Sequence, residues 1–311
     1  MTDLINAENL YRYYGQHCAV HDVSFSLTKG EVLGFLGPNG AGKTTTMQLL
    51  CGNLAPSSGN IHIKGINLLT DPNAAKLNLG YLPDTPPLYK DLTVNEFLAY
   101  CAQLHHIPKT HITKAIQTAR ARCGLTDVAN RLIGMLSKGY QQRVGIAQAI
   151  LHNPAVIVLD EPTVGLDPSQ IRAIRLLIRE LGQDHGIILS THILSEVQES
   201  CTHVQIIQQG RLILKTSISD LNRQLQSSSL HILTRLPVDV NRLSMIPGVN
   251  AIEVISPQQI RVQHTSTTDI SVPEAIAATI INSGWGLQEL TPLQPSLEDE
   301  YIRLTQPESL Q

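Results

Sequence analysis

The spacing Gly37-x-x-x-x-Gly42-Lys43-Thr44 restricts the fold of this chain more than any other feature of its sequence. The apolar run 32–36 precedes it and an apolar helical pattern follows it, which is the strand, loop and helix order of a phosphate-binding loop. Glycines at 37, 40 and 42 let successive backbone N–H groups point at one centre, where the helix N-terminus adds partial positive charge. The pattern therefore predicts an α/β fold with a phosphate site, and an ordinary glycine-rich turn is the poorer explanation.

Two polar side chains of this loop are expected to do chemistry. Lys43 would reach the outer phosphates of a nucleotide as a point charge. The hydroxyl of Thr44 would bind Mg²⁺, since this hard cation prefers oxygen ligands. The loop thus predicts a nucleotide bound together with a metal ion.

The composition is typical of a globular protein and argues against several other classes. The 311 residues leave room for two domains, and a net charge of -3 gives no basic surface for nucleic acid, so no such partner is expected. No apolar run reaches the roughly 18 residues of a membrane span, and the first residues do not resemble a signal peptide. We therefore expect a cytoplasmic protein whose five scattered cysteines are reduced and lie mostly in the core.

The segment before the phosphate loop alternates in the manner of β-strands. Residues 4–36 show this alternation, with turns at Gly15 and at 28–30, so an antiparallel β flap is expected. Tyr14 is a candidate for stacking on an adenine ring, because every base offers a π-face. The alternative is that Tyr14 only packs on the flap, as we expect of Tyr11 and Tyr13.

Acidic and basic side chains follow two buried strands further along the chain. The apolar run AVIVL ends in Asp160 and Glu161, and GIILST is followed by His192. Ligands of open parallel sheets bind at the carboxyl ends of the strands, and two adjacent uncompensated carboxylates there would destabilise each other, so the pair indicates a function. Asp160 on a metal and Glu161 as general base would supply that function, with His192 contacting phosphate.

The stretch from about 92 to 136 is helical in pattern and has no strand candidates. Thr93 and Glu96 form a capping box at its start. Cys101 and His105 share a helical face, but no second pair completes a tetrahedral set, so a metal site is not expected here. The segment is expected to be an all-helical insertion, followed by a helix that Ser137 caps.

These motifs occur together in one known family. The phosphate loop, SKGYQQR before a helix, the strand ending in Asp160-Glu161, the Gly165-Leu166-Asp167 loop and the strand before His192 resemble the ATP-binding subunits of ATP-binding cassette (ABC) transporters. The resemblance covers residues 4 to about 218. It implies a P-loop ATPase that binds ATP and Mg²⁺ and closes as a head-to-tail homodimer. Each ATP would lie between the phosphate loop of one subunit and Ser137–Gly139 of the other.

The resemblance also completes the set of candidate site residues. The expected nucleotide contacts are Tyr14, Gly37, Pro38, Asn39, Gly40, Ala41, Gly42, Lys43, Thr44, Thr45, Ser137, Lys138, Gly139 and Asp167. The expected metal contacts are Thr44, Asp160 and Asp84, and the expected catalytic residues are Glu161, His192 and Lys43. Asp84 stands where the family has a glutamine. The signature usually written LSGGQ reads LSKGY here, so Lys138 replaces a glycine and Tyr140 replaces a glutamine.

Three stretches resemble one subgroup of this family more closely. They are GYLPD with the PPLY and LTV segments after it, STHILSEV, and PSLEDEYIRLT near the C-terminus. They are similar to the cytosolic ATPases of type-2 ABC exporters, which serve gliding motility and the export of drugs or polysaccharides. This resemblance implies a separate transmembrane permease, which would hold the chain at the inner face of the cell membrane.

The C-terminal part differs in composition and has no nucleotide motif. We expect an ATP-binding domain at 1–222 and an accessory domain at 223–311, joined by the polar stretch DLNRQLQSSS. From HILTRL onward the pattern reads strand, helix, strand, strand, helix, strand, which predicts a small α+β domain of ferredoxin-like type. A last helix is expected over SLEDEYIRL.

The sequence therefore favours an ATP-hydrolysing subunit that powers an ABC-type exporter. Two alternatives remain open. A soluble ABC ATPase unconnected with transport usually has two cassettes or a long coiled coil, whereas this chain has one phosphate loop and no sustained heptads. A nucleotide-dependent regulator without hydrolysis is suggested by Asp84 and the altered signature, but Asp160, Glu161 and His192 argue against it.

Overall fold

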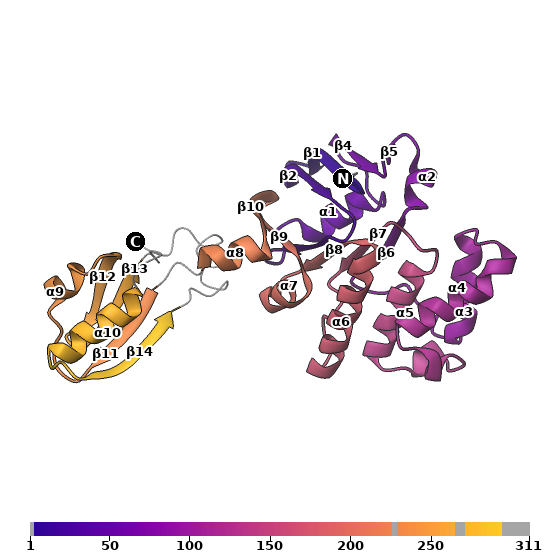
Figure 1. Cartoon of the computed structure of the whole chain (residues 1–311). Coiled ribbons are helices and arrows are strands. Elements are labelled where there is room, and N and C mark those ends of the chain that lie inside the picture. Colours follow the sequence, from indigo (N-terminus) through magenta and orange to yellow (C-terminus); the bar gives the residue numbers. More distant parts are fainter. Residues whose placement is uncertain (1–2, 226–228, 265–270, 294–311) are drawn as a thin grey trace. The chain divides into compact units, whose positions relative to one another are not determined.

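The chain divides into two compact units, Met1–Ile218 and Ser219–Gln311 (Figure 1). The structure is a computed structural model, and it describes residues 3–225, 229–264 and 271–293. Within these residues no helix is both long and apolar enough to cross a membrane. The first unit holds the phosphate loop and the motifs around it.

A six-stranded sheet forms the centre of the first unit, in the order β10-β9-β3-β8-β7-β6. All neighbours are parallel except β9 and β10. Its strands are β3 (Val32–Leu36), β6 (Leu79–Leu82), β7 (Val156–Asp160), β8 (Gly186–Thr191), β9 (His203–Gln208) and β10 (Arg211–Ser217). Because β3, β8 and β7 are adjacent and parallel, the loops that follow them meet at one edge of the sheet.

Helices cover both faces of this sheet, which explains the continuous apolar runs of its strands. They are α1 (Lys43–Leu50), α5 (Lys138–Ile150), α6 (Pro168–Asp184) and α7 (Leu194–Ser200). In β7, Val156 and Val158 belong to the hydrophobic cluster of α1 and the N-terminal strands. Ile157 and Leu159 belong to the cluster of α5 and α6. A strand buried on both faces is a rigid support for the residues at its end.

The predicted β flap is present as a second, antiparallel sheet in the order β2-β1-β4-β5. Its strands are β1 (Ile5–Tyr14), β2 (His17–Leu27), β4 (Ser58–Ile63) and β5 (Ile66–Asn67), and the short helix α2 (Pro72–Lys76) follows it. The turn between β1 and β2 holds Gly15 at a positive φ of 59°. This hairpin places Tyr14 at the end of the flap.

The predicted helical insertion contains α3 (Val94–Leu104), α4 (Lys109–Arg122) and two 3₁₀ turns, η1 (Thr126–Val128) and η2 (Ile133–Met135). The capping box of Thr93 and Glu96 is confirmed, with both reciprocal hydrogen bonds formed. An isolated antiparallel bridge joins Thr93 to Leu132. The two ends of the insertion therefore leave the rest of the unit side by side.

The cysteines are free thiols, as the sequence predicts, and three of the five are buried. Burial raises the pKa of the Cys123 thiol to about 12 and that of Cys101 to about 11. His105, which shares a helical face with Cys101, stacks on the ring of His152 with 3.9 Å between the ring centroids. The imidazole pair joins the end of α3 to the segment after α5.

The imidazole pair gives the first unit a pH-dependent stability. Burial, and then the neighbouring His105, lowers the pKa of His152 to about 4, against about 6.5 in an unfolded chain. As pH falls from 7 to 5 the unfolded chain binds this proton and the folded chain does not, so folding loses about 2 kcal/mol from this group. The variant H152Q keeps a donor for the Leu79 carbonyl, 3.0 Å from Nε2 in the wild type, and cannot titrate.

We expect the free energy of unfolding of H152Q to fall less than that of the wild type between pH 7 and pH 5, by about 2 kcal/mol. Denaturant titrations at the two pH values measure this difference. An equal fall in both proteins would contradict the assignment of the effect to His152.

The second unit contains a four-stranded antiparallel sheet in the order β12-β13-β11-β14. Its elements are β11 (Ser229–Thr234), α9 (Val240–Ser244), β12 (Val249–Ser256), β13 (Gln259–His264), α10 (Val272–Asn282) and β14 (Leu287–Leu293). Order and topology are those of the predicted ferredoxin-like domain. Its core packs side chains of the two helices on one face of the sheet.

The stretch expected to join the two domains is mostly the helix α8 (Ile218–Leu225), which the sequence pattern did not predict. The apolar residues Ile218, Leu221 and Leu225 have helical spacing. The polar residues between them made the segment resemble a linker. The helix predicted over 296–304 lies outside the described residues.

Candidate nucleotide-binding and catalytic site

The phosphate loop joins β3 to α1, and its glycines are required by the backbone. Gly40 and Gly42 have φ values of 80° and 104°, which favour glycine over any residue with a Cβ. A Cβ on Gly37 would lie 2.4 Å from the carbonyl oxygen of Ile207, and one on Gly42 would lie 2.5 Å from that of Ala19. The loop is therefore a tightly packed cradle at the N-terminus of α1, a position that favours anions.

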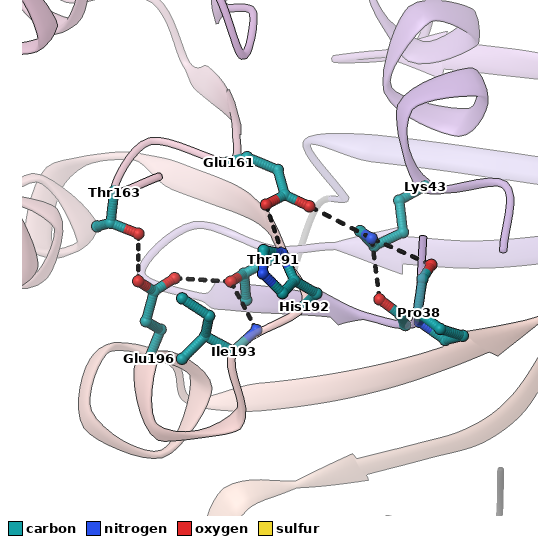
Figure 2. Close-up of polar contacts among 9 residues, drawn as sticks. Pro38, Lys43, Glu161, Thr163, Thr191, His192, Ile193 and Glu196 are labelled. Atoms are coloured by element: carbon teal, nitrogen blue, oxygen red, sulfur yellow. Dashed lines mark hydrogen bonds and ion pairs between the residues drawn. The ribbon is translucent and has the colours of Figure 1, made fainter. Parts of the chain in front are cut away.

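Lys43 lies at the centre of this cradle and is 5% exposed. Its Nζ donates to the carbonyl oxygens of Gly37 at 2.9 Å and Pro38 at 3.3 Å. The same atom is 3.3 Å from Oε1 of Glu161 (Figure 2). The ammonium group is thus held between the phosphate loop and the end of β7.

Glu161 and His192 meet at the carboxyl edge of the sheet, as the positions of their strands predict. Oε2 of Glu161 lies 2.6 Å from Nδ1 of His192. The backbone of Glu161 has a φ of 49°, and its N–H donates to the carbonyl of Ser190 at 3.0 Å. A left-handed conformation at such a residue costs about 1–2 kcal/mol and persists only where the surroundings hold it. The structure therefore brings Lys43, Glu161 and His192 into one connected group.

Asp160 is completely buried beside this group. Within the part of the chain that the structure describes, neither carboxylate oxygen has a hydrogen-bond partner. Burial raises the pKa of Asp160, and the hydroxyls of Ser190 and Thr44, which lie near the carboxylate but outside hydrogen-bond geometry, partly oppose the rise. Buried polar atoms are normally satisfied, and a divalent hard cation prefers such oxygens, so Asp160 and Thr44 fit a bound Mg²⁺.

Two cavities surround the phosphate loop. The larger, of about 600 Å³, is lined by Asn39, Thr44, Asp84, Thr85, Pro86, Leu88, Lys90, Lys138, Gln141, Gln142, Glu161, Val164 and His192. The smaller, of about 300 Å³, is lined by Tyr14, His17, Ala19, Asn39, Gly40, Gly42, Lys43, Thr44, Thr45 and Glu161. Tyr14 is 46% exposed there and stacks with the guanidinium of Arg12 at 4.9 Å. It lines the same cavity as residues of the phosphate loop, and its adenine contact stays a prediction.

The signature residues lie at the start of α5. Ser137 caps this helix, its hydroxyl accepting a bond from the N–H of Tyr140 at 3.4 Å. Lys138 lines the larger cavity of its own chain, and its amine lies beside Gly165, where a Cβ would have to displace this flexible side chain. Gly139 is buried. The contact of Ser137–Gly139 with a second subunit's nucleotide stays a prediction.

Two further candidates have local partners. Asp167 caps α6 by accepting from the N–H of Gln170 at 2.9 Å, and from the hydroxyl of Ser169 at 2.6 Å. These bonds lower the pKa of Asp167. The carboxylate of Asp84 accepts from the N–H of Thr85 at 2.7 Å and lines the larger cavity beside Thr44. The metal contact predicted for Asp84 is not tested by this hydrogen bond and stays a prediction.

Sequence reasoning missed a buried carboxylate next to these residues. Glu196 in α7 is 1% exposed and accepts hydrogen bonds from the hydroxyls of Thr163 and Thr191 (Figure 2). The only signal in the sequence is a glutamate four residues after His192 in a helical segment. That signal cannot reveal the partners, because Thr163 lies in the loop after β7 and Thr191 at the end of β8.

The comparisons with known proteins agree with this geometry. A family model described as ABC transporter matches residues 20–164. The uncharacterized ABC transporter ATP-binding protein YxlF of Bacillus subtilis is 33% identical, over 97% of this chain and 99% of its own length. The bacitracin transport ATP-binding protein BcrA of Bacillus licheniformis is 32% identical, over 98% of both chains.

A solved structure described as the ATP-binding subunit of an ABC transporter superposes with a TM-score of 0.64 at 32% identity. It covers 71% of this chain and 92% of its own. The relatives are similar over nearly the full length, and the solved structure shares the fold around the phosphate loop. The chain therefore belongs to the ATP-binding subunits of ABC transporters.

Proposed function

We propose that this chain hydrolyses ATP in the presence of Mg²⁺ and that hydrolysis powers an ABC-type exporter. The observation that carries the proposal is the connected group of Lys43, Glu161 and His192, which lies at the end of the central strands beside the unsatisfied carboxylate of Asp160. Groups that are held in place where charge develops are the main requirement of phosphoryl transfer.

Each residue has a role in this proposal that its position supports. The backbone N–H groups of the phosphate loop and the ammonium of Lys43 bind the phosphate chain of ATP. Glu161 orients the attacking water and accepts its proton, and His192 contacts the outermost phosphate. Thr44 and Asp160, with Asp84, would hold Mg²⁺, which neutralises charge on the phosphate oxygens. Tyr14 would stack on the adenine ring.

A second copy of the chain completes the site in this proposal. Ser137, Lys138 and Gly139 of one subunit would contact the ATP held by the phosphate loop of the other, with Asp167 near the same seam. The position of Ser137 at the N-terminus of α5 supports this role, because helix N-termini favour anions. ATP would then close a head-to-tail homodimer, and hydrolysis would reopen it.

The partner in this proposal is a separate transmembrane permease of the type-2 exporter class. The name of the relative BcrA records transport of bacitracin, which supports a transport role for this chain. The helical insertion and the loop around Asp84 would pass the motion of the dimer to the permease. The chain would then be cytoplasmic and peripheral at the inner face of the cell membrane.

We also propose that the chain consists of two domains. Residues 1–222 would form the ATP-binding domain with its helical insertion at about 92–136, and residues 223–311 an accessory domain. The two compact units, which divide after Ile218, support a boundary in this region.

The rate of phosphate release by the purified full-length chain tests the proposal. Activity should require Mg²⁺, and the rate per chain should rise with protein concentration, since two chains make each site. A chain that binds ATP without releasing phosphate would be a nucleotide-dependent regulator instead. A rate per chain that does not depend on concentration would remove the dimer from the mechanism.

A further inference from the structure

The carboxylate of Glu196 closes a ring of contacts around the two residues at the centre of the site. Oε2 accepts from the hydroxyl of Thr191 at 2.7 Å, and Oε1 accepts from the hydroxyl of Thr163. Thr191 directly precedes His192, and Thr163 follows Glu161 by two residues. His192 and Glu161 contact each other at 2.6 Å on the opposite side of the ring. Figure 2 shows Glu196 between Thr163 and Thr191.

The contacts of Glu196 are buried on every side. Thr163, Thr191 and Glu196 are 3%, 1% and 1% exposed. Charge-assisted hydrogen bonds that exclude water are stronger than exposed ones, and they hold their partners in one geometry. The hydroxyl of Thr191 also accepts from the N–H of Ile193 at 3.0 Å, which fixes the backbone on the far side of His192.

The backbone of Glu161 needs such support. Its left-handed conformation is unfavourable for a glutamate and requires neighbouring contacts to hold it. The N–H of Val164 donates to the carbonyl of Glu161 at 3.3 Å, which closes a turn around Thr163. The bond from Thr163 to Glu196 ties this turn to α7.

We propose that Glu196 is a positioning residue for ATP hydrolysis. By holding Thr163 and Thr191 it fixes the two loops that carry Glu161 and His192, so that the two side chains keep their mutual contact. This inference rests on the proposed function for its catalytic consequence. The hydrogen bonds of Glu196 itself go to Thr163 and Thr191 and not to the phosphate loop, so its loss should lower turnover more than nucleotide binding.

The expected result is a selective loss of turnover. The variant E196A should lower kcat by about 10- to 100-fold, because a displacement near 1 Å at a catalytic group costs up to about 100-fold. KM for ATP should change less than about threefold, since Lys43 and the loop glycines are untouched. E196Q, which can accept from one hydroxyl and donate to the other, should stay within about threefold of wild type.

Two comparisons separate positioning from a general structural role. In an H192A background, E196A should cause little further loss, because effects of residues that act as a unit are not additive. S200A is the matched control: Ser200 is also buried in α7, and its hydroxyl has no hydrogen-bond partner among the described residues. It should retain wild-type turnover. If E196A does not fold, T163V removes one of the two bonds and should lower kcat by about 3- to 10-fold.

A readout without hydrolysis makes the test independent of the proposed function. Long-range ¹H–¹⁵N spectra of histidine-labelled full-length protein report the imidazole of His192, whose signal H192A identifies. E196A should shift this signal and E196Q should not. An unchanged signal in E196A, a kcat within twofold of wild type, or an E196Q as inactive as E196A would overturn the inference. A wild type that releases no phosphate would overturn the proposed function, while the spectra still decide the positioning.

Discussion

Replacing Glu161 with glutamine is expected to lower steady-state ATP hydrolysis by about 1,000-fold. Removing a positioned general base costs about 100- to 10,000-fold, and glutamine cannot accept the proton of the attacking water. Glutamine has nearly the volume of glutamate and can keep one bond to His192, so the site should still bind ATP. The ATP-bound dimer should therefore accumulate, because it closes and does not turn over.

Phosphate release measures the loss of turnover, and light scattering coupled to size-exclusion chromatography with MgATP measures the dimer. The control is E180Q, which changes an exposed carboxylate on α6 that pairs with Arg122. It should hydrolyse ATP like the wild type and stay monomeric under the same conditions. Turnover of E161Q within a few-fold of wild type would remove Glu161 from the role of base.

The second large effect is expected at Lys43, where K43A should weaken ATP binding by about 100-fold. Truncating a buried, hydrogen-bonded charge typically costs about 2–5 kcal/mol, and 100-fold corresponds to about 2.7 kcal/mol. K43R should not restore binding. A guanidinium is a planar fork, whereas the carbonyls of Gly37 and Pro38, 2.9 and 3.3 Å from Nζ, hold a compact ammonium in a narrow space.

Equilibrium binding of a fluorescent ATP analogue measures this loss without hydrolysis. K29A is the control, because Lys29 is exposed and precedes β3, at the opposite end of that strand from the phosphate loop. It should bind ATP like the wild type. Binding of K43A within threefold of wild type would show that the backbone N–H groups of the loop alone hold the phosphates.

Much of the site could be predicted from sequence because its motifs lie at ends of buried strands. The phosphate loop follows β3, Glu161 follows β7 and His192 follows β8, and parallel strands end at one edge. The antiparallel flap and the strand and helix order of the second unit were likewise visible, because their periodicity is local.

The features of the site and fold that the sequence did not predict depend on contacts between segments far apart in the chain or on unfavourable local conformations. Glu196 shows no periodicity or motif that indicates its partners, since Thr163 and the end of β8 at Thr191 come together only once β7 and β8 are paired. The left-handed backbone of Glu161 is also invisible in sequence, because the residue type disfavours it. Helix α8 was missed because polar residues dominate a short amphipathic segment.

Because Glu161 forms an ion pair with Lys43, its carboxylate competes with the triphosphate of ATP for the same ammonium group. The E161Q substitution removes this competition as well as the proton acceptor. Any increase in ATP affinity of E161Q would therefore have two causes, the loss of the competing charge and the arrest of turnover. The affinity for ADP, which is not hydrolysed, measures the first cause alone.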